Sequence, residues 1–468
     1  MGRTYSQAML IVTSVAIMAT ALGIVVLYGP DYLYVSIAIL TALLSLLRPG
    51  WALMGYLALS ASLPSSEGVD NREIATFGLL MWLFLLANLH WIINPPADRR
   101  LRSLIITTDI FFLTALVSLG IALTNDLTFT DWARDLVPLS NLSLLVVMPA
   151  LVRHPKDVRI MIWLFVGVFA LVGFHSAWTL LGEILPGRPY FNIPFRIGGT
   201  WLPVLLIVAG FVGMAESDRV DWRFVGLSAI GIVTTVLTNT RTVWISSTLA
   251  IGLVLLSNLT NRRISLKGNG AILLLPALLA GGIIAVMYAP GNEEVLERHQ
   301  SRFETLKDLG SDQSYQIRQS QIREAMAIFR ERPVFGIGLG YLYEYKEYAQ
   351  RYDQPNNFNH CDPANYLAKM GIVGTAALYF LLLSAIAFAG RLKKRSPDLL
   401  QRWLAGFSQI GIAASLVVGY STPVLQSRET TFCLGVLLGL LATTVAQAQV
   451  SEAAQEPHET VAEQLASA

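Results

Sequence analysis

PGNEEVLERHQSRFETLKDLGSDQSYQIRQSQIREAMAIFRERPVFGIGLG, residues 290–340, opens the one long polar segment of a sequence that is otherwise apolar. The segment closes with NNFNHCDPANYLAKMGIVGT, residues 356–375. The chain has 468 residues, of which 54% are hydrophobic and 14% are charged, and its mean hydropathy is +0.53. A soluble domain carries about 25% charged residues. We therefore expect the polar segment to meet water, the rest of the chain to lie in lipid, and the chemistry to occur where the two meet.

Apolar runs of about 20 residues recur from one end of the sequence to the other, which is the length that a helix needs to cross a bilayer. Backbone polar groups in lipid must be bonded within their own segment, so these runs are predicted to be helices. The fold class is thus an all-α polytopic membrane protein with 12–14 transmembrane helices, because the second and third spans are short enough to form a tilted or re-entrant hairpin. The fourteen candidate spans cover about 7–28, 31–47, 51–64, 74–93, 104–123, 136–152, 159–185, 199–215, 222–238, 241–258, 270–289, 364–390, 403–424 and 430–447.

Basic residues are distributed unevenly between the alternate loops of this arrangement. With the N-terminus in the cytoplasm, the cytoplasmic loops hold eighteen Lys and Arg residues, whereas the short outer loops and span ends hold seven. Cytoplasmic loops of membrane proteins carry such an excess. Both termini are therefore predicted to be cytoplasmic and residues 290–364 to face outward, which is the periplasm in a Gram-negative cell.

Four regions follow from this layout. They are an N-terminal transmembrane bundle at 1–289, a helical periplasmic loop domain at 290–364, C-terminal transmembrane helices at 365–448, and a disordered cytoplasmic tail at 449–468 that is rich in Ala, Glu and Gln.

The loop domain has local signals of its own. A helix is predicted over about 314–331, ending before Pro333. FGIGLG at 335–340 is predicted to be a flexible turn, and the tyrosine-rich stretch after it to be an amphipathic helix along the lipid headgroups. The apolar side of the 314–331 helix is predicted to carry Ile317, Ile322, Met326 and Phe329.

One histidine lies at the end of the loop, immediately before a span. His360 is a candidate general base, because an imidazole can take a proton from an alcohol near neutral pH. The alternative is a polar histidine at the membrane interface without chemistry.

Four arginines are predicted on the same outer side. Arg196 and Arg241 lie at the mouths of spans, and Arg318 and Arg323 lie on the 314–331 helix. Guanidinium groups match phosphate oxygens in bidentate geometry and stay charged. Together they are predicted to hold a diphosphate leaving group while His360 activates a hydroxyl. The alternatives are snorkelling to the headgroups and a solvated helix face.

Other chemistries find less support in the sequence. The outer segment shows no DxD pair and no His/Cys cluster at ligand spacing, so neither a metal site nor a cofactor is predicted. The glycines of FGIGLG follow no strand, so they do not indicate a nucleotide loop. A thiol nucleophile at Cys361 lacks a visible orienting group, and two cysteines, Cys361 and Cys433, are too few for a disulfide framework.

These motifs, in this order, resemble the O-antigen ligase and O-antigen polymerase superfamily of polytopic, metal-independent GT-C-type glycosyltransferases. The resemblance covers about 135 residues by motif, and the hydropathy layout covers the rest. Two positions depart from the family pattern, because Cys361 stands where Asn, Ser or Gln is usual and Ile322 stands where an aromatic residue is expected. The matching landmarks are Arg241 with Trp244, Arg318 ahead of Pro333 and FGIGLG, and His360 eleven residues before Gly371 and Gly374.

The resemblance implies transfer of a glycan from undecaprenyl diphosphate to a hydroxyl, with inversion at the anomeric carbon. His360 would be the base, Arg241 and Arg318 would grip the diphosphate, and Arg196 and Arg323 would be further phosphate contacts. Tyr341, Tyr343 and Tyr345 would stack on sugar rings or lie among the headgroups. An O-antigen ligase of the bacterial inner membrane, with lipid A-core as acceptor and membrane lipids but no nucleic acid as partners, is the leading interpretation.

Several rivals stay open at this point. Within the superfamily they are an O-antigen or exopolysaccharide polymerase, whose acceptor is another lipid-linked repeat unit, and a protein O-oligosaccharyltransferase. From other classes they are a transporter of lipid-linked oligosaccharide and a structural assembly factor. The sequence shows no inverted repeat of the kind that transporters often carry.

Overall fold

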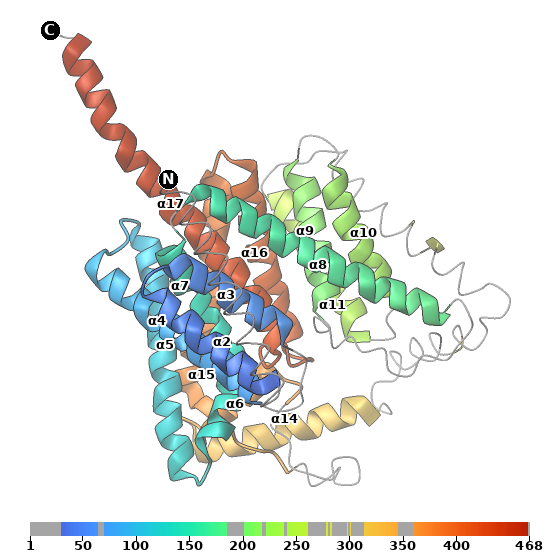
Figure 1. The fold of residues 1–468 in the computed structure, drawn as a ribbon. Coiled ribbons are helices and arrows are strands. Elements are labelled where there is room, and N and C mark those ends of the chain that lie inside the picture. The colour runs from blue at the N-terminus through green and yellow to red at the C-terminus, as the bar shows by residue number, and fades with distance from the viewer. Residues whose placement is uncertain are drawn as a thin grey trace. The chain divides into compact units, whose positions relative to one another are not determined.

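Helices make up the regular structure of the computed structural model of this chain (Figure 1). The structure describes residues 30–63, 70–152, 154–184, 201–217, 221–237, 241–260, 313–344 and 359–466, with a few isolated positions between 278 and 300. Within these ranges no β-strand is assigned. The chain divides into two compact units, Met1–Ile93 and Asn94–Ala468. The predicted all-α class is confirmed.

The first unit contains three described helices, α2 (Pro30–Ser45), α3 (Pro49–Ser62) and α4 (Asn71–Ile93). Helix α2 packs against both of the others. Proline at the first position of α3 fits a helix start, where its missing N–H is not needed. The indole N–H of Trp82 on α4 donates to Ser45 Oγ at the end of α2 at 2.9 Å and joins these two helices.

The second unit contains the remaining helices. Across the two units, each predicted span that the structure describes over most of its length is helical, and the span predicted at 136–152 is formed by α6, η1 and α7 in succession. The spans predicted at 7–28 and 270–289 lie almost wholly outside the described residues. The helices are α5 (Arg99–Thr124), α6 (Phe129–Ser140), the 3₁₀ turn η1 (Asn141–Ser143), α7 (Leu144–Leu151), α8 (Pro155–Ile184), α9 (Leu202–Glu216), α10 (Trp222–Leu237), α11 (Arg241–Thr260), α14 (Gln313–Glu331), α15 (Asp362–Arg395), α16 (Leu399–Val418) and α17 (Arg428–Ala466).

Length and hydropathy identify the membrane-spanning elements. Among the described residues six helical segments are long and apolar enough to cross a bilayer, and α2, α9, α10 and α11 add shorter apolar helices. Polar side chains cap some of the helices where they begin. Asp98 accepts from the N–H groups of Arg100 and Leu101 at the start of α5, and Thr128 and Asp131 form a capping box at the start of α6. The chain is thus a polytopic helical membrane protein.

Helix α17 differs from prediction at its C-terminal end. The tail at 449–468 was expected to be disordered, yet α17 continues to Ala466. The tail is rich in Ala, Glu and Gln, which are strong helix formers.

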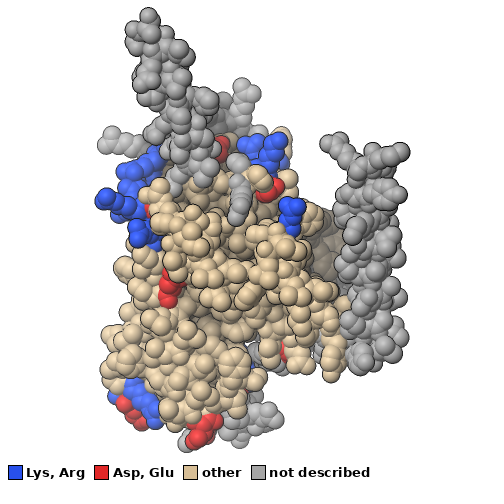
Figure 2. Space-filling view, turned by 60° about the vertical axis from the view of Figure 1, so that its left-hand side comes forward, with Lys and Arg blue, Asp and Glu red and all other residues tan. Residues whose placement is uncertain are grey.

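The two ends of the second unit have different chemistry. At one end, which we call the loop end, the connections 125–128, 332–344, 359–361 and 419–427 meet the outer turns of α5, α6 and α15. At the other end of α15, Glu216 is buried and accepts from Lys393 at 3.2 Å and from Arg402 at 3.1 Å. Figure 2 shows the visible face as mostly uncharged, with Lys and Arg gathered near its upper end.

Helix α15 is broken near the loop end. Gly371 has φ +62° and ψ −167°, which interrupts the helical bonding of its turn. The FGIGLG segment repairs the gap, since the N–H groups of Ile337 and Gly338 donate to the carbonyls of Ala368 and Lys369. On the other side of the break, Ile372 and Val373 donate to Pro333 and Val334.

These four backbone bonds satisfy groups that an unbroken helix would have paired internally. Residues 333–340, which include the turn at 335–340 that was expected to be flexible, therefore form a clamp on a transmembrane helix. For the same reason the segment predicted as a loop domain at 290–364 is, in its described part, continuous with the membrane helices of the second unit.

Candidate active site

His360 lies at the loop end, two residues before α15 begins. The segment around it is anchored on the loop before α17. The side chain of Gln426 donates to the Asn359 carbonyl and to Asp362 Oδ1, both at 2.8 Å, and its oxygen accepts from the Asn359 N–H at 3.1 Å. The other carboxylate oxygen of Asp362 accepts from the Leu425 N–H at 2.9 Å. The start of α15 thus holds the backbone of His360 at a fixed position.

Helix α14 covers the other side of this segment. Asn359 donates from Nδ2 to the Gln321 carbonyl at 2.8 Å, and the His360 N–H donates to Gln321 Oε1 at 3.2 Å. The same Gln321 oxygen lies 2.7 Å from Nδ1 of the His360 ring. Gln321 is only 1% exposed, so these bonds form away from bulk water.

Electrostatics keep the His360 ring neutral. Burial, together with the positive charge of the nearby Arg318, lowers the pKa of His360 from 6.5 to about 4. Burial is the larger cause, because it penalises the charged imidazolium. At neutral pH the ring is therefore uncharged and can accept a proton.

The structure separates the two arginines predicted on α14. Arg318 is partly buried and close enough to His360 to affect its charge state. Arg323 is exposed. The cause is helical phase, because residues 318 and 321 lie three positions apart on one face and residue 323 lies outside that face.

The buried face of α14 also differs from the predicted one. Ile317, Gln321 and Ala325 are buried, whereas Met326 and Phe329 are only partly buried. Ala325 packs in a small core with Cys361 and residues of α15, and Ile322 touches its edge. The large apolar residues therefore predicted a stripe of α14 next to the one that is buried, because a polar glutamine and a small alanine form the centre of the contact.

Tyr341 and Tyr343, the two described tyrosines of the three predicted to contact sugars, follow the glycine clamp, and neither lies in a helix. Tyr343 is 0% exposed, and its hydroxyl donates to Asn365 Oδ1 at 3.0 Å. It therefore supports α15 from within instead of presenting its ring to a sugar. Tyr341 is partly buried and meets Tyr343 edge to face at 5.5 Å. Burial, with the charge of Glu324, raises the pKa of Tyr341.

The remaining predicted site residues are less fully described. Arg241 is the first residue of α11, and the structure describes its backbone but not its side chain. The indole of Trp244, one turn later, donates to the Thr235 carbonyl at 2.9 Å and ties α11 to α10. Arg196 and Tyr345 lie outside the described residues.

Three residues of the site carried no signal in our interpretation of the sequence. Gln321 contacts His360, Asn359 bridges to α14, and Gln426 holds the segment from a loop 66 residues further along the chain. The sequence could have indicated Gln321, because it lies three positions after Arg318 on the same helix. It could not have indicated Gln426, because the contact of Gln426 with the segment depends on how α15 and α17 pack.

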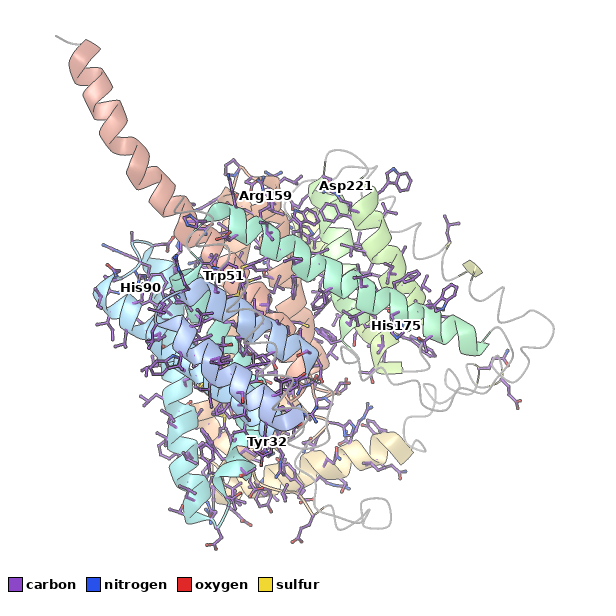
Figure 3. The ribbon with its side chains drawn as sticks, in the orientation of Figure 1. Tyr32, Trp51, His90, Arg159, His175 and Asp221 are labelled. Atoms are coloured by element: carbon purple, nitrogen blue, oxygen red, sulfur yellow. The ribbon has the colours of Figure 1, made fainter. Side chains whose placement is uncertain are left out.

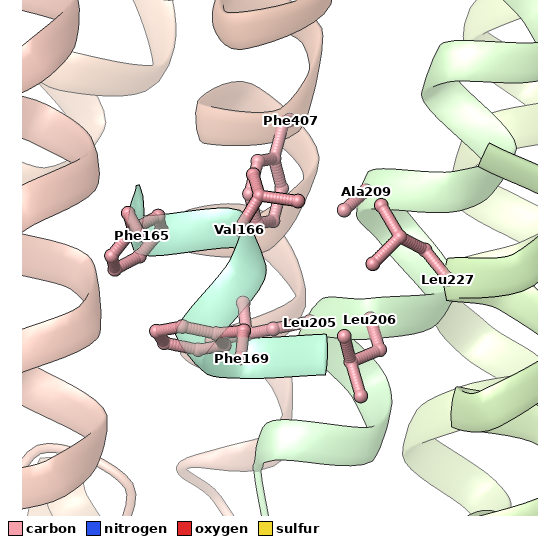
Figure 4. Close-up of a pocket in the computed structure, with 8 residues that line it drawn as sticks. All are labelled: Phe165, Val166, Phe169, Leu205, Leu206, Ala209, Leu227 and Phe407. Carbon is pink, nitrogen blue, oxygen red and sulfur yellow. The ribbon is translucent and has the colours of Figure 1, made fainter. Parts of the chain in front are cut away.

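Other parts of the described structure offer no comparable site. No three His, Cys, Asp or Glu side chains in the described ranges lie together as a metal site would need. The histidines labelled in Figure 3, His90 on α4 and His175 on α8, belong to other helices. A small pocket between α8, α9, α10 and α16 has only apolar walls, among them Phe165, Leu205 and Phe407 (Figure 4).

Comparison with known proteins tests the predicted family resemblance. Comparison with curated proteins finds no match. Residues 226–379 match the family model described as O-antigen ligase. The matched range begins in α10, contains Arg241, Arg318 and His360, and ends beyond the break in α15. This match supports the predicted resemblance to the O-antigen ligase and O-antigen polymerase superfamily.

Proposed function

We propose that this protein is an O-antigen ligase-type glycosyltransferase of the bacterial inner membrane, which transfers a glycan from undecaprenyl diphosphate to a hydroxyl of lipid A-core on the periplasmic side. The observation that supports it best is a neutral His360 beside the partly buried cation Arg318, inside the stretch that matches the family. A base and a phosphate-binding cation at one place suit transfer from a diphosphate donor.

The reaction can be written with His360 and the arginines in separate roles. The His360 ring takes the proton of the acceptor hydroxyl as its oxygen bonds to the anomeric carbon. The bond from that carbon to the diphosphate breaks on the opposite face, so the configuration inverts. The diphosphate leaves with the electron pair, and Arg318 and Arg241 stabilise its charge. The periplasm holds no ATP, and the activated donor supplies the free energy.

The test is glycan transfer with purified protein, lipid-linked O-antigen and lipid A-core, in EDTA and without nucleotide. Wild type should make capped lipid A-core, and His360→Ala should lower the rate by about 10²–10⁴-fold, the usual contribution of a general base. His175→Ala is the matched control, because His175 is exposed on α8 and far along the chain from the site.

The products identify the acceptor. Capped lipid A-core supports a ligase, a lengthened lipid-linked donor indicates a polymerase, and glycan on an added protein acceptor indicates an O-oligosaccharyltransferase. Full activity of His360→Ala would contradict the proposed mechanism. Transfer to none of these acceptors, with substrates that a known enzyme can use, would contradict the proposed function.

A further inference from the structure

The contact between Gln321 and His360 determines which ring nitrogen carries the proton. The backbone N–H of His360 can only donate, and it points at Gln321 Oε1 at 3.2 Å. An amide nitrogen placed there would set one donor against another. The atom facing His360 must therefore be the amide oxygen, which resolves the usual ambiguity between the two ends of a glutamine side chain.

The same oxygen then constrains the ring. It lies 2.7 Å from Nδ1 of His360, which is a hydrogen-bond distance. Since an amide oxygen accepts and never donates, Nδ1 must carry a proton. An unprotonated Nδ1 would bring two lone pairs together in a place where Gln321 is only 1% exposed.

We infer that Gln321 is a positioning residue that holds the proton of neutral His360 on Nδ1 and leaves the lone pair on Nε2 as the only proton acceptor of the ring. Its role in catalysis rests on the proposed function, whereas the assignment of the tautomer does not. In the reaction, Nε2 would take the proton of the acceptor hydroxyl, and the ring would become an imidazolium with Nδ1–H still bonded to Gln321.

The backbone around the pair supports a fixed geometry. The Gln321 carbonyl accepts from Asn359 Nδ2, and Gln426 holds Asn359 from the other side. The first of these bonds uses the main-chain carbonyl of Gln321, and the bonds of Gln426 do not involve Gln321. A change of the Gln321 side chain therefore alters its contacts with the ring and with the backbone N–H of His360, while the anchoring of residue 359 remains.

The tautomer can be measured without any transfer assay. Protein labelled with ¹⁵N in its six histidine rings is examined by NMR in nanodiscs at neutral pH, and the His360→Gln variant identifies the signals of His360. We expect a protonated nitrogen at Nδ1 and an unprotonated one at Nε2. Protonation at Nε2 alone, or at both nitrogens, would overturn the inference.

Variants then connect the tautomer to activity. Gln321→Leu removes the acceptor and should lower kcat by about 10²–10⁴-fold, the range of general-base catalysis. Gln321→Glu keeps the acceptor and adds a negative charge that favours the imidazolium. It should retain transfer, with the acid limb of its kcat/KM profile moved to higher pH. Gln319→Leu, the same change two residues away on α14, is the control.

The outcomes distinguish the positioning role of Gln321 from the proposed function. A merely structural role for Gln321 would lower the amount of folded protein in both Gln321 variants and leave the kcat of the folded Gln321→Leu protein unchanged, which would contradict the inference. If the predicted tautomer is found but wild type transfers glycan to none of the acceptors, the proposed function fails while the contact between Gln321 and His360 stands.

Discussion

Nζ of Lys369 on α15 lies 2.7 Å from Oδ2 of Asp135 on α6, and the same oxygen accepts the N–H of Gly340 at 2.6 Å. One carboxylate thus joins two membrane helices to the last glycine of the clamp. The Lys369 side chain is 0% exposed and that of Asp135 is 9% exposed. Because both side chains are buried and bonded to each other, we assign the pair to the support of α15 instead of to substrate binding.

Removal of one member of this pair should destabilise the protein. Lys369→Met leaves the Asp135 carboxylate buried without its cation, and the loss of one partner of a buried ion pair costs about 3–5 kcal/mol. We expect a lower melting temperature in detergent, measured by the loss of monodisperse protein on heating. The double variant Lys369→Met, Asp135→Leu should regain part of the loss. An unchanged melting temperature for Lys369→Met would show that the pair contributes nothing.

Gly371 should tolerate no side chain. Its φ of +62° with ψ near 180° belongs to a region that is essentially limited to glycine, and other residues there cost about 1–3 kcal/mol. A Cβ would also meet the backbone of Val334 and Phe335. Gly371→Ala should therefore lower both the melting temperature and transfer.

Gly226→Ala is the matched control for this change. Gly226 lies in α10 within the same family match, and a Cβ there meets nothing within 4 Å. Alanine is favoured over glycine in a helix by about 0.5–1 kcal/mol. Gly226→Ala should thus be neutral or slightly stabilising, and equal behaviour of the two variants would contradict the role given to the break.

The pH dependence of transfer should reflect the lowered pKa of His360. The ring is the active base when neutral, so activity is lost as pH falls through its pKa in the folded protein. With that pKa near 4, the acid limb of kcat/KM should lie well below the ordinary histidine value of 6.5. Arg318→Gln removes the positive neighbour and should move the limb upward, although burial, the larger cause, should keep it below 6.5. A wild-type limb at 6.5 would contradict this account.

Much of the fold could be predicted from hydropathy and length. The described helices follow the predicted spans, because apolar runs in lipid have few alternatives to a helix. The break at Gly371 could not be predicted, since Gly371 and Gly374 are compatible with a continuous helix and only the docking of FGIGLG makes the break favourable. The helical backbone of the tail was not predicted, because the prediction rested on low hydrophobicity and not on intrinsic helix propensity.

The site was predictable in part. The motif order singled out His360 and Arg318 as candidates, and the structure brings them close enough for Arg318 to affect the charge state of His360. Tyr343 could not be placed correctly from sequence, because an aromatic residue in a polar loop suggests stacking on a ligand, whereas its burial and its bond to Asn365 depend on tertiary packing. The contact of Gln321 with His360 could not be predicted either, since the role of a glutamine on a polar helix depends on which partner the fold places beside it.

Cys361 should be dispensable for transfer. Its side chain is 6% exposed, and burial raises the pKa of the thiol, so little thiolate exists at neutral pH. Cys361→Ala should retain most of the activity, and the wild-type protein should react slowly with maleimide at this position. Cys433→Ala serves as the reference for labelling. Loss of transfer in Cys361→Ala, with the protein folded, would reopen the possibility of a thiol nucleophile.

The two arginines of α14 should respond differently to the same change. Arg318→Lys keeps the charge but loses the planar fork that binds phosphate in bidentate fashion. Loss of one such stabiliser commonly costs about 10²–10³-fold in rate. Arg323 is exposed and lies outside the face of α14 that meets His360, so Arg323→Lys should leave the rate close to that of the wild type.

Rates for both variants are measured with the same lipid-linked donor and acceptor. Arg318→Lys should lower kcat while it leaves the acid limb of the pH profile unmoved, because the positive charge beside His360 remains. Equal losses in the two variants would mean that substrate binding draws Arg323 into the site, and equal retention would remove Arg318 from the group that stabilises the diphosphate.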